Sequence, residues 1–502
     1  MNLFLSIALL VVLQVMGYRE GTPEQNYEDF RIMHILVLLY LLYKGYQYFR
    51  ENPGYFLINP LFTTLVITFG LGFGVFTNFL FLKDGEFLVA DYQLNLDYDM
   101  YWYKRAMFNI GLALVAFIDG HRSAWGTRLY EWLSGFVTGV LGLLGKSYTN
   151  LMVSTTKVYV VYVLLVIFRF WLIDAGLYGR LVSPEVLVSD AYTQVSQYIN
   201  IIVSASLGAF FFVAMLYYRK KCPRLIMALI LVLELFLGFL AGSRGLFLLP
   251  LATFAFAGYL TKKKVTLLPT LLVTLGLFIA MTIIVPFKAF YDTYRDQVDL
   301  TDPIKTTTEF YDYFISNPRN VEVLDLMATS MEQDSWFVSL FSNTNYSTEV
   351  AASIRHVEEF EMPPDSPEFV NNLVLSPVYA VVPRFLLPSK PVQTSGLWFR
   401  EKILQHQVGQ GGTSIGYTAI GHLQFTGKGP LLVFLGFWFV GVLQSSFFQF
   451  LKTGTAVGLV IFLVMMSRLH LIDSIYDAII ITYIRNIFIA IAALMVFLKP
   501  DK

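Results

Sequence analysis

Two short segments carry arginines in positions suited to binding an anionic head group. Gly242-Ser-Arg-Gly245 predicts a tight turn between two long apolar runs, so Arg244 stands at a helix end with little loop around it. Arg384 lies far along the chain in Pro383-Arg384, close to Pro388-Ser-Lys-Pro391, where prolines restrict the backbone. A guanidinium group matches two phosphate oxygens and stays ionised, so these cations suggest a phosphate site. The alternatives are a helix-end arginine that reaches lipid phosphates and a rigid loop with solvated charges.

Two histidines could take a proton from a hydroxyl group. His422 follows the glycine-rich segment Gly411-Gly-Thr-Ser-Ile-Gly416, and glycines let the backbone approach a ligand closely. His470 lies beside Arg468, with Asp473 about one turn further on. The alternative for the first is a structural histidine after a linking segment. The alternative for the second is an ordinary ion pair at a helix end.

The composition indicates a membrane protein. The chain has 502 residues, of which 56% are hydrophobic and 14% are charged; soluble domains carry about 25% charged residues. Apolar runs of about 20 residues, the length needed to cross a bilayer, recur from end to end. Lipid offers no partner to backbone polar groups, so such spans are helices. The only cysteine is Cys222, which excludes an internal disulfide.

We therefore predict an all-α polytopic membrane protein with about twelve transmembrane helices. The first apolar run lacks a basic start and a small-residue cleavage site, so it is interpreted as a retained helix. The predicted division is helices 1 to 9 in residues 1–287, one large external loop in 288–427 and helices 10 to 12 in 428–502. The predicted limits are 2–17, 31–49, 56–82, 104–120, 151–175, 196–218, 225–241, 244–260, 265–287, 428–451, 455–470 and 475–498.

Basic residues predict the orientation of these helices. Arg219-Lys-Lys-Cys-Pro-Arg224 and Lys262-Lys-Lys264 are the densest basic clusters, and cytoplasmic loops carry an excess of such residues. A count of twelve helices that starts inside places both clusters in the cytoplasm. Both termini are then cytoplasmic as well.

The large external loop differs between its two halves. Residues 288–370 are acidic and contain amphipathic stretches, for example around Phe310, which suit helices along the membrane surface. Residues 371–427 carry four basic residues, Arg384, Lys390, Arg400 and Lys402, and one acidic residue, Glu401. A loop of this length is usually functional or disordered, and its aromatic content favours function.

Three charged residues fall within apolar runs, namely Arg169, Glu234 and Arg485. Charges inside a membrane are costly and usually face a partner or an interior cavity. We predict that Glu234 pairs with one of the two arginines, and a substrate pathway is the alternative. The chain has no Walker loop, HExxH, CxxC pair or basic-aromatic array. No metal, no cofactor and no nucleic-acid partner is therefore predicted.

The combination of motifs resembles a known family. Gly242-Ser-Arg-Gly245, Val382-Pro-Arg-Phe-Leu-Leu-Pro-Ser-Lys-Pro391 and the segment from Gly411 to Gly421 resemble features of the bacterial Wzy-type O-antigen and capsule polymerases. The related O-antigen ligases share this architecture. The twelve-helix layout with internal termini fits the family too. The resemblance covers mainly residues 225–450, and the N-terminal third matches only by topology.

The resemblance implies a substrate, a reaction and a location. The substrate is an oligosaccharide repeat unit carried on undecaprenyl pyrophosphate. The reaction moves a growing glycan from its lipid carrier onto the next lipid-linked unit without a metal, at the periplasmic face of the bacterial inner membrane. The product is a surface polysaccharide of the lipopolysaccharide or capsule kind. Family members often act with a chain-length regulator protein.

The resemblance and the residues together give the expected site. Arg244 and Arg384 fall on the family's arginine positions, and we expect the pyrophosphate or glycan to be bound by Arg244, Arg384, Lys390, Arg400 and Arg468. The base is expected to be His422 or His470, and Glu309 and Asp312 stay open as candidates. Two alternatives remain for the whole protein. One is a ligase that transfers a finished glycan, and the other is a transporter of lipid-linked sugars, although no internal repeat of the transporter kind is found.

Overall fold

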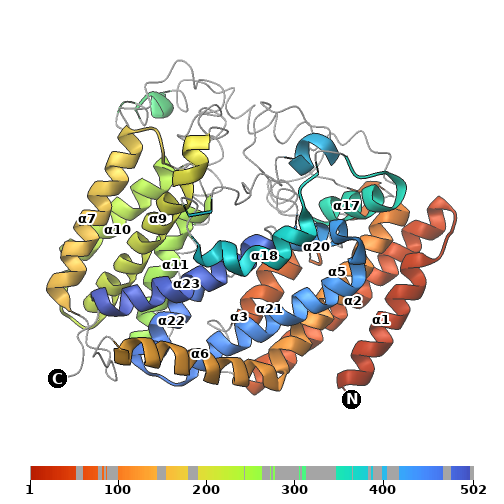
Figure 1. The fold of residues 1–502 in the computed structure, drawn as a ribbon, viewed down its shortest axis with the longest axis horizontal. Helices are drawn as coiled ribbons and strands as arrows, with labels where there is room; N and C mark the ends of the chain where they lie inside the picture. The colour runs from red at the N-terminus through yellow and green to blue at the C-terminus, as the bar shows by residue number, and fades with distance from the viewer. Residues whose placement is uncertain are drawn as a thin grey trace. The chain divides into compact units, whose positions relative to one another are not determined.

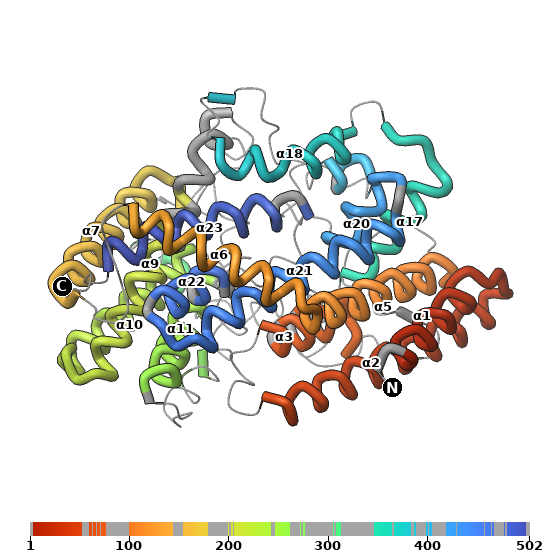
Figure 2. Tube along the Cα trace, turned by 60° about the horizontal axis from the view of Figure 1, so that its bottom comes forward, coloured from red at the N-terminus to blue at the C-terminus, as the bar shows by residue number. Residues whose placement is uncertain are grey.

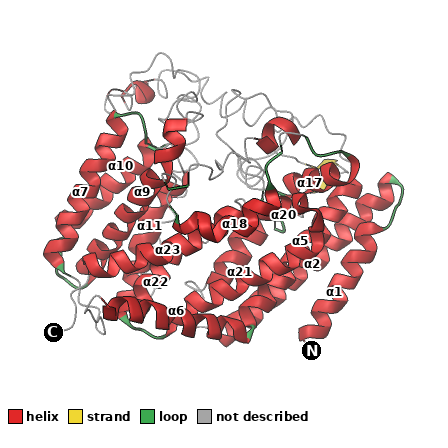
Figure 3. Ribbon diagram, in the orientation of Figure 1, coloured by secondary structure: helices red, strands yellow, loops and turns green. Residues whose placement is uncertain are grey.

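The computed structural model of the chain consists mainly of helices (Figure 3). Among the residues that the structure describes, the only sheet is an antiparallel pair of two-residue strands, β1 (Leu82–Lys83) and β2 (Glu86–Phe87). The described residues are 2–52, 60–76, 82–83, 86–87, 100–143, 154–178, 190–241, 244–262, 272, 275–276, 305, 308–312, 346–363, 366–382, 386–387, 398–403, 418–466 and 476–497.

The chain groups into two compact units. Unit 1 comprises Met1–Thr149 and Phe337–Ile491, and unit 2 comprises Asn150–Trp336 and Ala492–Lys502. The later part of the predicted external loop therefore folds with the first helices of the chain. The division of the sequence at residues 287 and 427 stays a prediction.

Helix α5 (Met100–Arg122) is the centre of unit 1. Helices α1 (Asn2–Tyr18), α2 (Pro23–Glu51) and α21 (Gly429–Lys452) lie against it (Figure 1). Nearly all of its side chains are buried, and the Phe117 ring lies 6.0 Å from that of Phe69. The unit also contains α3 (Pro60–Thr63), the π-helical segment η2 (Thr64–Gly72), α6 (Ala124–Leu143), α17 (Ser347–Glu359), α18 (Phe369–Val381), η4 (Phe399–Ile403), α20 (Ala419–Leu423), η5 (Gln424–Lys428), α22 (Ala456–Met466) and most of α23 (Tyr476–Phe497).

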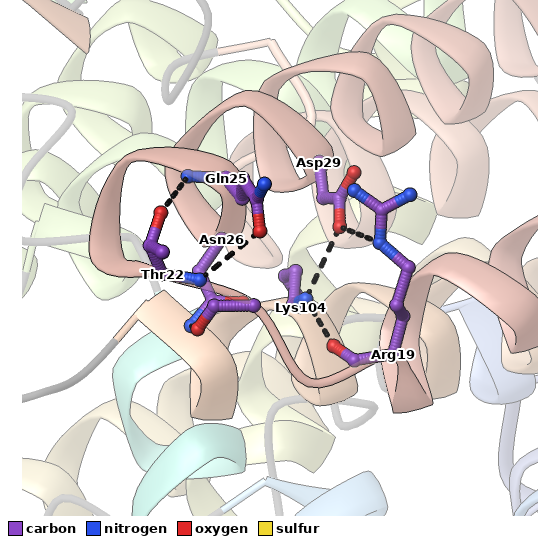
Figure 4. A network of polar contacts seen from close by, with 7 residues as sticks. Arg19, Thr22, Gln25, Asn26, Asp29 and Lys104 are labelled. Carbon is purple, nitrogen blue, oxygen red and sulfur yellow. Dashed lines mark hydrogen bonds and ion pairs between the residues drawn. The ribbon is translucent and has the colours of Figure 1, made fainter.

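The turn between α1 and α2 is fixed by polar contacts (Figure 4). Thr22 and Gln25 form a capping box, in which each backbone N–H donates to the other side chain, at 3.2 and 3.3 Å. The Lys104 Nζ of α5 donates to the Arg19 carbonyl at 2.7 Å and to Asp29 Oδ2 at 3.3 Å. Since the Lys104 side chain is fully buried, these two partners offset the cost of removing its charge from water.

The described part of unit 2 contains the helices α7 (Thr155–Asp174), α9 (Asp190–Tyr218), α10 (Arg224–Leu240) and α11 (Arg244–Lys262). Helix α9 packs against α7 and α11, and α10 packs against α11. Leu172, Tyr178 and Leu237 belong to one buried apolar cluster. Helix α10 ends at Leu240 and α11 begins at Arg244, while Gly242 and Ser243, on which the predicted tight turn depends, lie outside the described residues.

Several helices have the character of membrane spans. Thr155–Asp174, Gly429–Lys452 and Ile479–Phe497 are long and apolar enough to cross a bilayer. Shorter apolar helices occur at Phe4–Tyr18, Pro60–Gly70, Ala205–Tyr218, Leu246–Thr261 and Phe369–Val381. The all-helical, membrane-type fold is thus supported, while the count of twelve spans and the orientation stay predictions.

Two segments differ from the predicted spans. In the predicted span 56–82, η2 ends at Gly72, and the backbone turns at Gly74, whose φ is 70°. Helix α6 occupies residues that the predicted spans leave out, because its sequence mixes apolar residues with Arg128, Glu131 and several glycines. The predicted span 265–287 lies almost wholly outside the described residues.

Candidate functional site

Helix α17, from the predicted external loop, is fixed to the first helices of unit 1. The Tyr346 N–H just before it donates to the Gly72 carbonyl at 2.7 Å. Tyr103 of α5 and Thr348 share a hydroxyl hydrogen bond of 3.1 Å. At the other end of α17, Arg105 of α5 makes an ion pair with Glu358. These contacts hold one face of α17 against the start of α5.

That face of α17 carries a buried carboxyl group. Glu349 is 6% exposed, and its Oε2 has no hydrogen-bond partner among the described residues. Burial raises the pKa of this carboxyl to about 7, because the charged form loses its hydration. An acidic group with such a pKa can exchange a proton near neutral pH. Glu349 is therefore a candidate acid or base that the sequence did not single out.

Helix α20, which carries His422, also packs against α17. Its N-terminus is capped by Thr418, whose Oγ1 accepts the Gly421 N–H at 3.1 Å. A Cβ at Gly421 would lie 2.6 Å from the Ser353 Oγ of α17, so the two helices touch where only glycine fits. Ser353 is one helical turn from Glu349 and donates to its carbonyl at 2.7 Å. His422 is thus next in sequence to a contact between α17 and α20.

His422 is held as a neutral imidazole. The side chain is 1% exposed, and burial lowers its pKa to about 3. Its ring lies 5.5 Å from that of Phe369, which begins α18, in an edge-to-face arrangement. A neutral imidazole both donates and accepts one hydrogen bond, so His422 is better suited to orienting a hydroxyl than to carrying charge.

Aromatic rings surround this contact between α17 and α20. Phe369, Trp398 and Phe425 lie with ring centroids 5.2 to 5.6 Å apart, and His356 of α17 lies 6.2 Å from Phe425. The Trp398 Nε1 and His356 Nε2 atoms are buried and have no hydrogen-bond partner within the described part of the chain. These rings therefore form a buried apolar cluster beside His422.

A polar chain links this region back to α5. Gln424 of η5 donates its side-chain amide to the Asn109 Oδ1 at 3.0 Å, and Asn109 donates to the Arg105 carbonyl at 2.9 Å. All three residues lie in unit 1, and Gln424 is two residues from His422. Helices α5, α17 and α20 are therefore joined by packing and hydrogen bonds, and Glu349 and His422 are buried among the residues of unit 1.

For most of the residues predicted for the site, the structure does not describe the side chain. Arg244 begins α11 and Arg400 lies in η4, but only the backbone of each is described. Arg384, Lys390, Arg468 and His470 lie outside the described residues. Of the candidate bases, Glu309 is within 3.8 Å of Lys305 in a solvated pair, and Asp312 is exposed. His422 is the predicted site residue that the structure brings to the α17 and α20 cluster.

The predicted pairing of charges within the apolar helices is confirmed in unit 2. Arg169 of α7 binds both carboxylate oxygens of Glu234 of α10, at 2.7 and 2.9 Å. The same guanidinium donates to the hydroxyls of Ser206 at 2.9 Å and Tyr178 at 2.8 Å. Tyr162 donates to the Glu234 carboxylate at 2.9 Å. This network leaves neither buried charge without a partner, as an ion pair inside an apolar helix bundle requires.

No metal centre is found in the described ranges, which contain no group of three or more His, Cys, Asp or Glu residues able to hold an ion. The chain matches no protein-family model, no curated protein and no solved structure. The likeness to the Wzy-type polymerases therefore depends on the sequence motifs alone.

Proposed function

We propose that the protein polymerises oligosaccharide repeat units carried on undecaprenyl pyrophosphate into a surface polysaccharide. The transfer is an inverting glycosyl transfer at the periplasmic face of the bacterial inner membrane. The observation that supports it best is the contact of α17 with α20, which gathers a buried carboxyl, a neutral imidazole and an aromatic cluster. The motifs around Arg244 and Arg384 support the choice of a pyrophosphate-linked donor.

The proposed reaction is a single displacement. A hydroxyl of the acceptor sugar attacks C1 of the donor sugar, and the new C–O bond forms as the bond from C1 to pyrophosphate breaks. The pyrophosphate leaves with the electron pair, and the hydroxyl proton passes to the Glu349 carboxylate. Arginines stabilise the leaving group most when they are already in place before the reaction. This is the role proposed for Arg244 and Arg384.

Glu349 is proposed as the base because its pKa matches the task. A pKa near 7 leaves a large fraction of the carboxylate free at neutral pH and still gives it enough basicity to accept a proton. Neutral His422, with a pKa near 3, would orient the hydroxyl. Since Glu349 is buried on α17, which packs against both α5 and α20, the proposal requires the acceptor hydroxyl to be admitted among these helices.

The proposal includes a topology. Twelve spans, cytoplasmic termini and a periplasmic loop over 288–427 would put Glu349 and His422 on the same side of the membrane as Arg384. In the ranges that the structure describes, three long apolar helices and five shorter ones support the membrane-spanning part of this arrangement. The basic clusters at 219–224 and 262–264 support its orientation.

The test is a reconstitution with purified protein and a synthetic undecaprenyl-pyrophosphate oligosaccharide, with products read by gel and mass spectrometry. We expect a ladder of multiples of the repeat unit that persists in EDTA. Arg244→Ala and Arg384→Ala should leave only the single unit. Arg50→Ala, at the exposed end of α2, is the matched control and should keep the ladder.

The outcomes separate the proposal from its alternatives. A ladder unchanged in both arginine variants would refute the role of the two cations. No ladder in the wild type, with transfer to a different added acceptor, would indicate a ligase. Movement of the substrate across the vesicle membrane without any new glycosidic bond would indicate a transporter.

A further inference from the structure

One face of helix α6 packs against the rest of unit 1. Gly126, Leu133, Val137 and Leu141 are buried, and they recur at the spacing of helical turns. A Cβ at Gly126 would lie 2.5 Å from the Ser445 Oγ of α21, so the backbone of α6 lies directly on α21. The Tyr130 ring meets the Phe450 ring of α21 edge to face at 4.7 Å. This face accounts for one apolar stripe of the helix.

A second apolar stripe runs along another side of α6. Trp125, Trp132, Phe136 and Leu143 are separated by seven, four and seven residues, which brings them onto one line of an α-helix. All four are exposed, Trp132 by 66% and Leu143 by 90%. Trp132 and Phe136 stack on each other with centroids 6.2 Å apart. An ordinary solvated helix does not carry an aligned row of exposed aromatic residues.

The third face of α6 is polar. Glu131, Ser134 and Thr138 lie on the side away from the aromatic stripe, as the helical repeat requires. Arg128 lies between this face and the aromatic stripe, with its guanidinium 5.1 Å from the Trp125 ring. The order around the helix is therefore protein, aromatic stripe, arginine and polar face.

The contacts of α6 with α5 and α21 indicate where α6 lies relative to the end of an apolar span. It follows α5 after a single residue, Ser123, and crosses α21 (Figure 2) near the end of that helix. Helix α21 is long and apolar enough to span a bilayer and ends at Lys452. Lys452 ends α21 and Arg128 lies in the first turns of α6, while Arg122, at the end of α5, is ion-paired with Glu51.

We propose that α6 lies in the membrane interface and binds a bilayer surface containing anionic phospholipids. Trp125, Trp132, Phe136 and Leu143 insert among the acyl chains, Arg128 meets the phosphates, and Glu131 and Thr138 face water. Amphipathic helices with tryptophan on the apolar face and arginine beside it bind membranes in this way. The inference does not depend on the proposed glycosyl transfer.

Site-directed fluorescence quenching tests this placement. Cys222→Ala removes the only cysteine, and Trp132→Cys, Leu143→Cys or Thr138→Cys then adds a single attachment site for an environment-sensitive dye. The labelled protein is reconstituted in vesicles whose acyl chains are brominated. We expect strong quenching by bromine and weak quenching by aqueous iodide at 132 and 143. The reverse is expected at 138, on the polar face of the same helix.

Lipid charge is tested with the same labels. Bromine carried on phosphatidylglycerol should quench position 132 more than the same amount of bromine on phosphatidylcholine, because the cations enrich anionic lipid around α6. Equal quenching by the two would overturn the anionic preference. Equal iodide access at 132 and 138 would overturn the insertion. Protection of 132 from iodide without quenching by either lipid would also overturn it, because a second copy of the chain would then cover the stripe.

Discussion

Glu349 and His422 lie on two helices that contact each other. Burial shifts the pKa values of their side chains in opposite directions. Desolvation raises the pKa of the Glu349 carboxyl to about 7 and lowers that of His422 to about 3. Near neutral pH one group can therefore change its charge while the other stays neutral. A division of this kind is how enzymes separate acid and base roles within one site.

The rate of transfer should follow the ionisation of Glu349. We predict that kcat/KM rises with pH and levels off above an apparent pKa near 7, because the carboxylate is the form that accepts the proton. Glu349→Gln should lower kcat about 100-fold or more and remove this rise. The measurement is a pH–rate profile of both proteins. A profile that keeps its rise in the variant would exclude Glu349 as the base.

The same carboxyl should affect stability in a predictable direction. Its folded pKa lies above its ordinary value of 4.5, so the stability that it provides when protonated is lost as pH rises through about 7. A shift of this size corresponds to about 3 kcal/mol. Glu349→Gln should therefore have a melting temperature that rises relative to the wild type between pH 5 and pH 8. Thermal unfolding in detergent at both values measures it, and a constant difference would contradict the buried environment.

The Arg169 and Glu234 pair gives a prediction about packing alone. Arg169→Met should lower the unfolding free energy by about 3–5 kcal/mol, because it leaves Glu234 buried without its cation. The double change with Glu234→Leu should recover most of that loss, because no charge is then left buried. Thermal unfolding of the wild type and the variants is the measurement. A double variant as unstable as the single one would show that the pair is not the source of the effect.

At the scale of elements, the contact of α17 with α20 depends on the absence of one side chain. Gly421→Ala would place a methyl group 2.6 Å from the Ser353 Oγ, and overpacking of this kind costs about 1–3 kcal/mol. Gly45→Ala in α2 is the matched control, because its Cβ would meet nothing within 4 Å. We expect a lower melting temperature for the first variant only. Equal melting temperatures would mean that the two helices separate easily.

Some elements could be predicted from the sequence because a single local rule determines them. The limits of α10 and α11 follow from the break between two apolar runs, and the pairing of Glu234 follows from the cost of an unpaired charge in lipid. Helix α6 was not predicted as a span because its apolar residues are divided between two faces and are separated in the sequence by polar residues and glycines. They therefore form no continuous apolar run of the length of a span.

Glu349 could not be predicted for a different reason. Residues 288–370 are rich in acidic side chains, and nothing local to Glu349 distinguishes it from the others. Its burial results from the packing of α17 on α5, fixed by the hydrogen bond from Tyr103 to Thr348 across 245 positions of the sequence. His422 was found from its glycine-rich setting, although its burial and neutral state depend on α17 and α18.

At the scale of the whole molecule, the orientation in the membrane is open to a direct test. In a Cys222→Ala background, Lys221→Cys and Glu361→Cys each add one exposed thiol, in the basic cluster before α10 and in the segment after α17. We predict that a membrane-impermeant maleimide labels position 361 in intact spheroplasts and position 221 only after permeabilisation. The opposite pattern would reverse the topology and remove Glu349 from the periplasmic side.

The most direct test of the central claim is to count repeat units by mass spectrometry after purified wild type or Glu349→Gln acts on a synthetic undecaprenyl-pyrophosphate oligosaccharide. The account predicts a series of multiples for the wild type and only the starting unit for the variant. A wild type that forms no glycosidic bond, or a variant that makes the same series at the same rate, would contradict it.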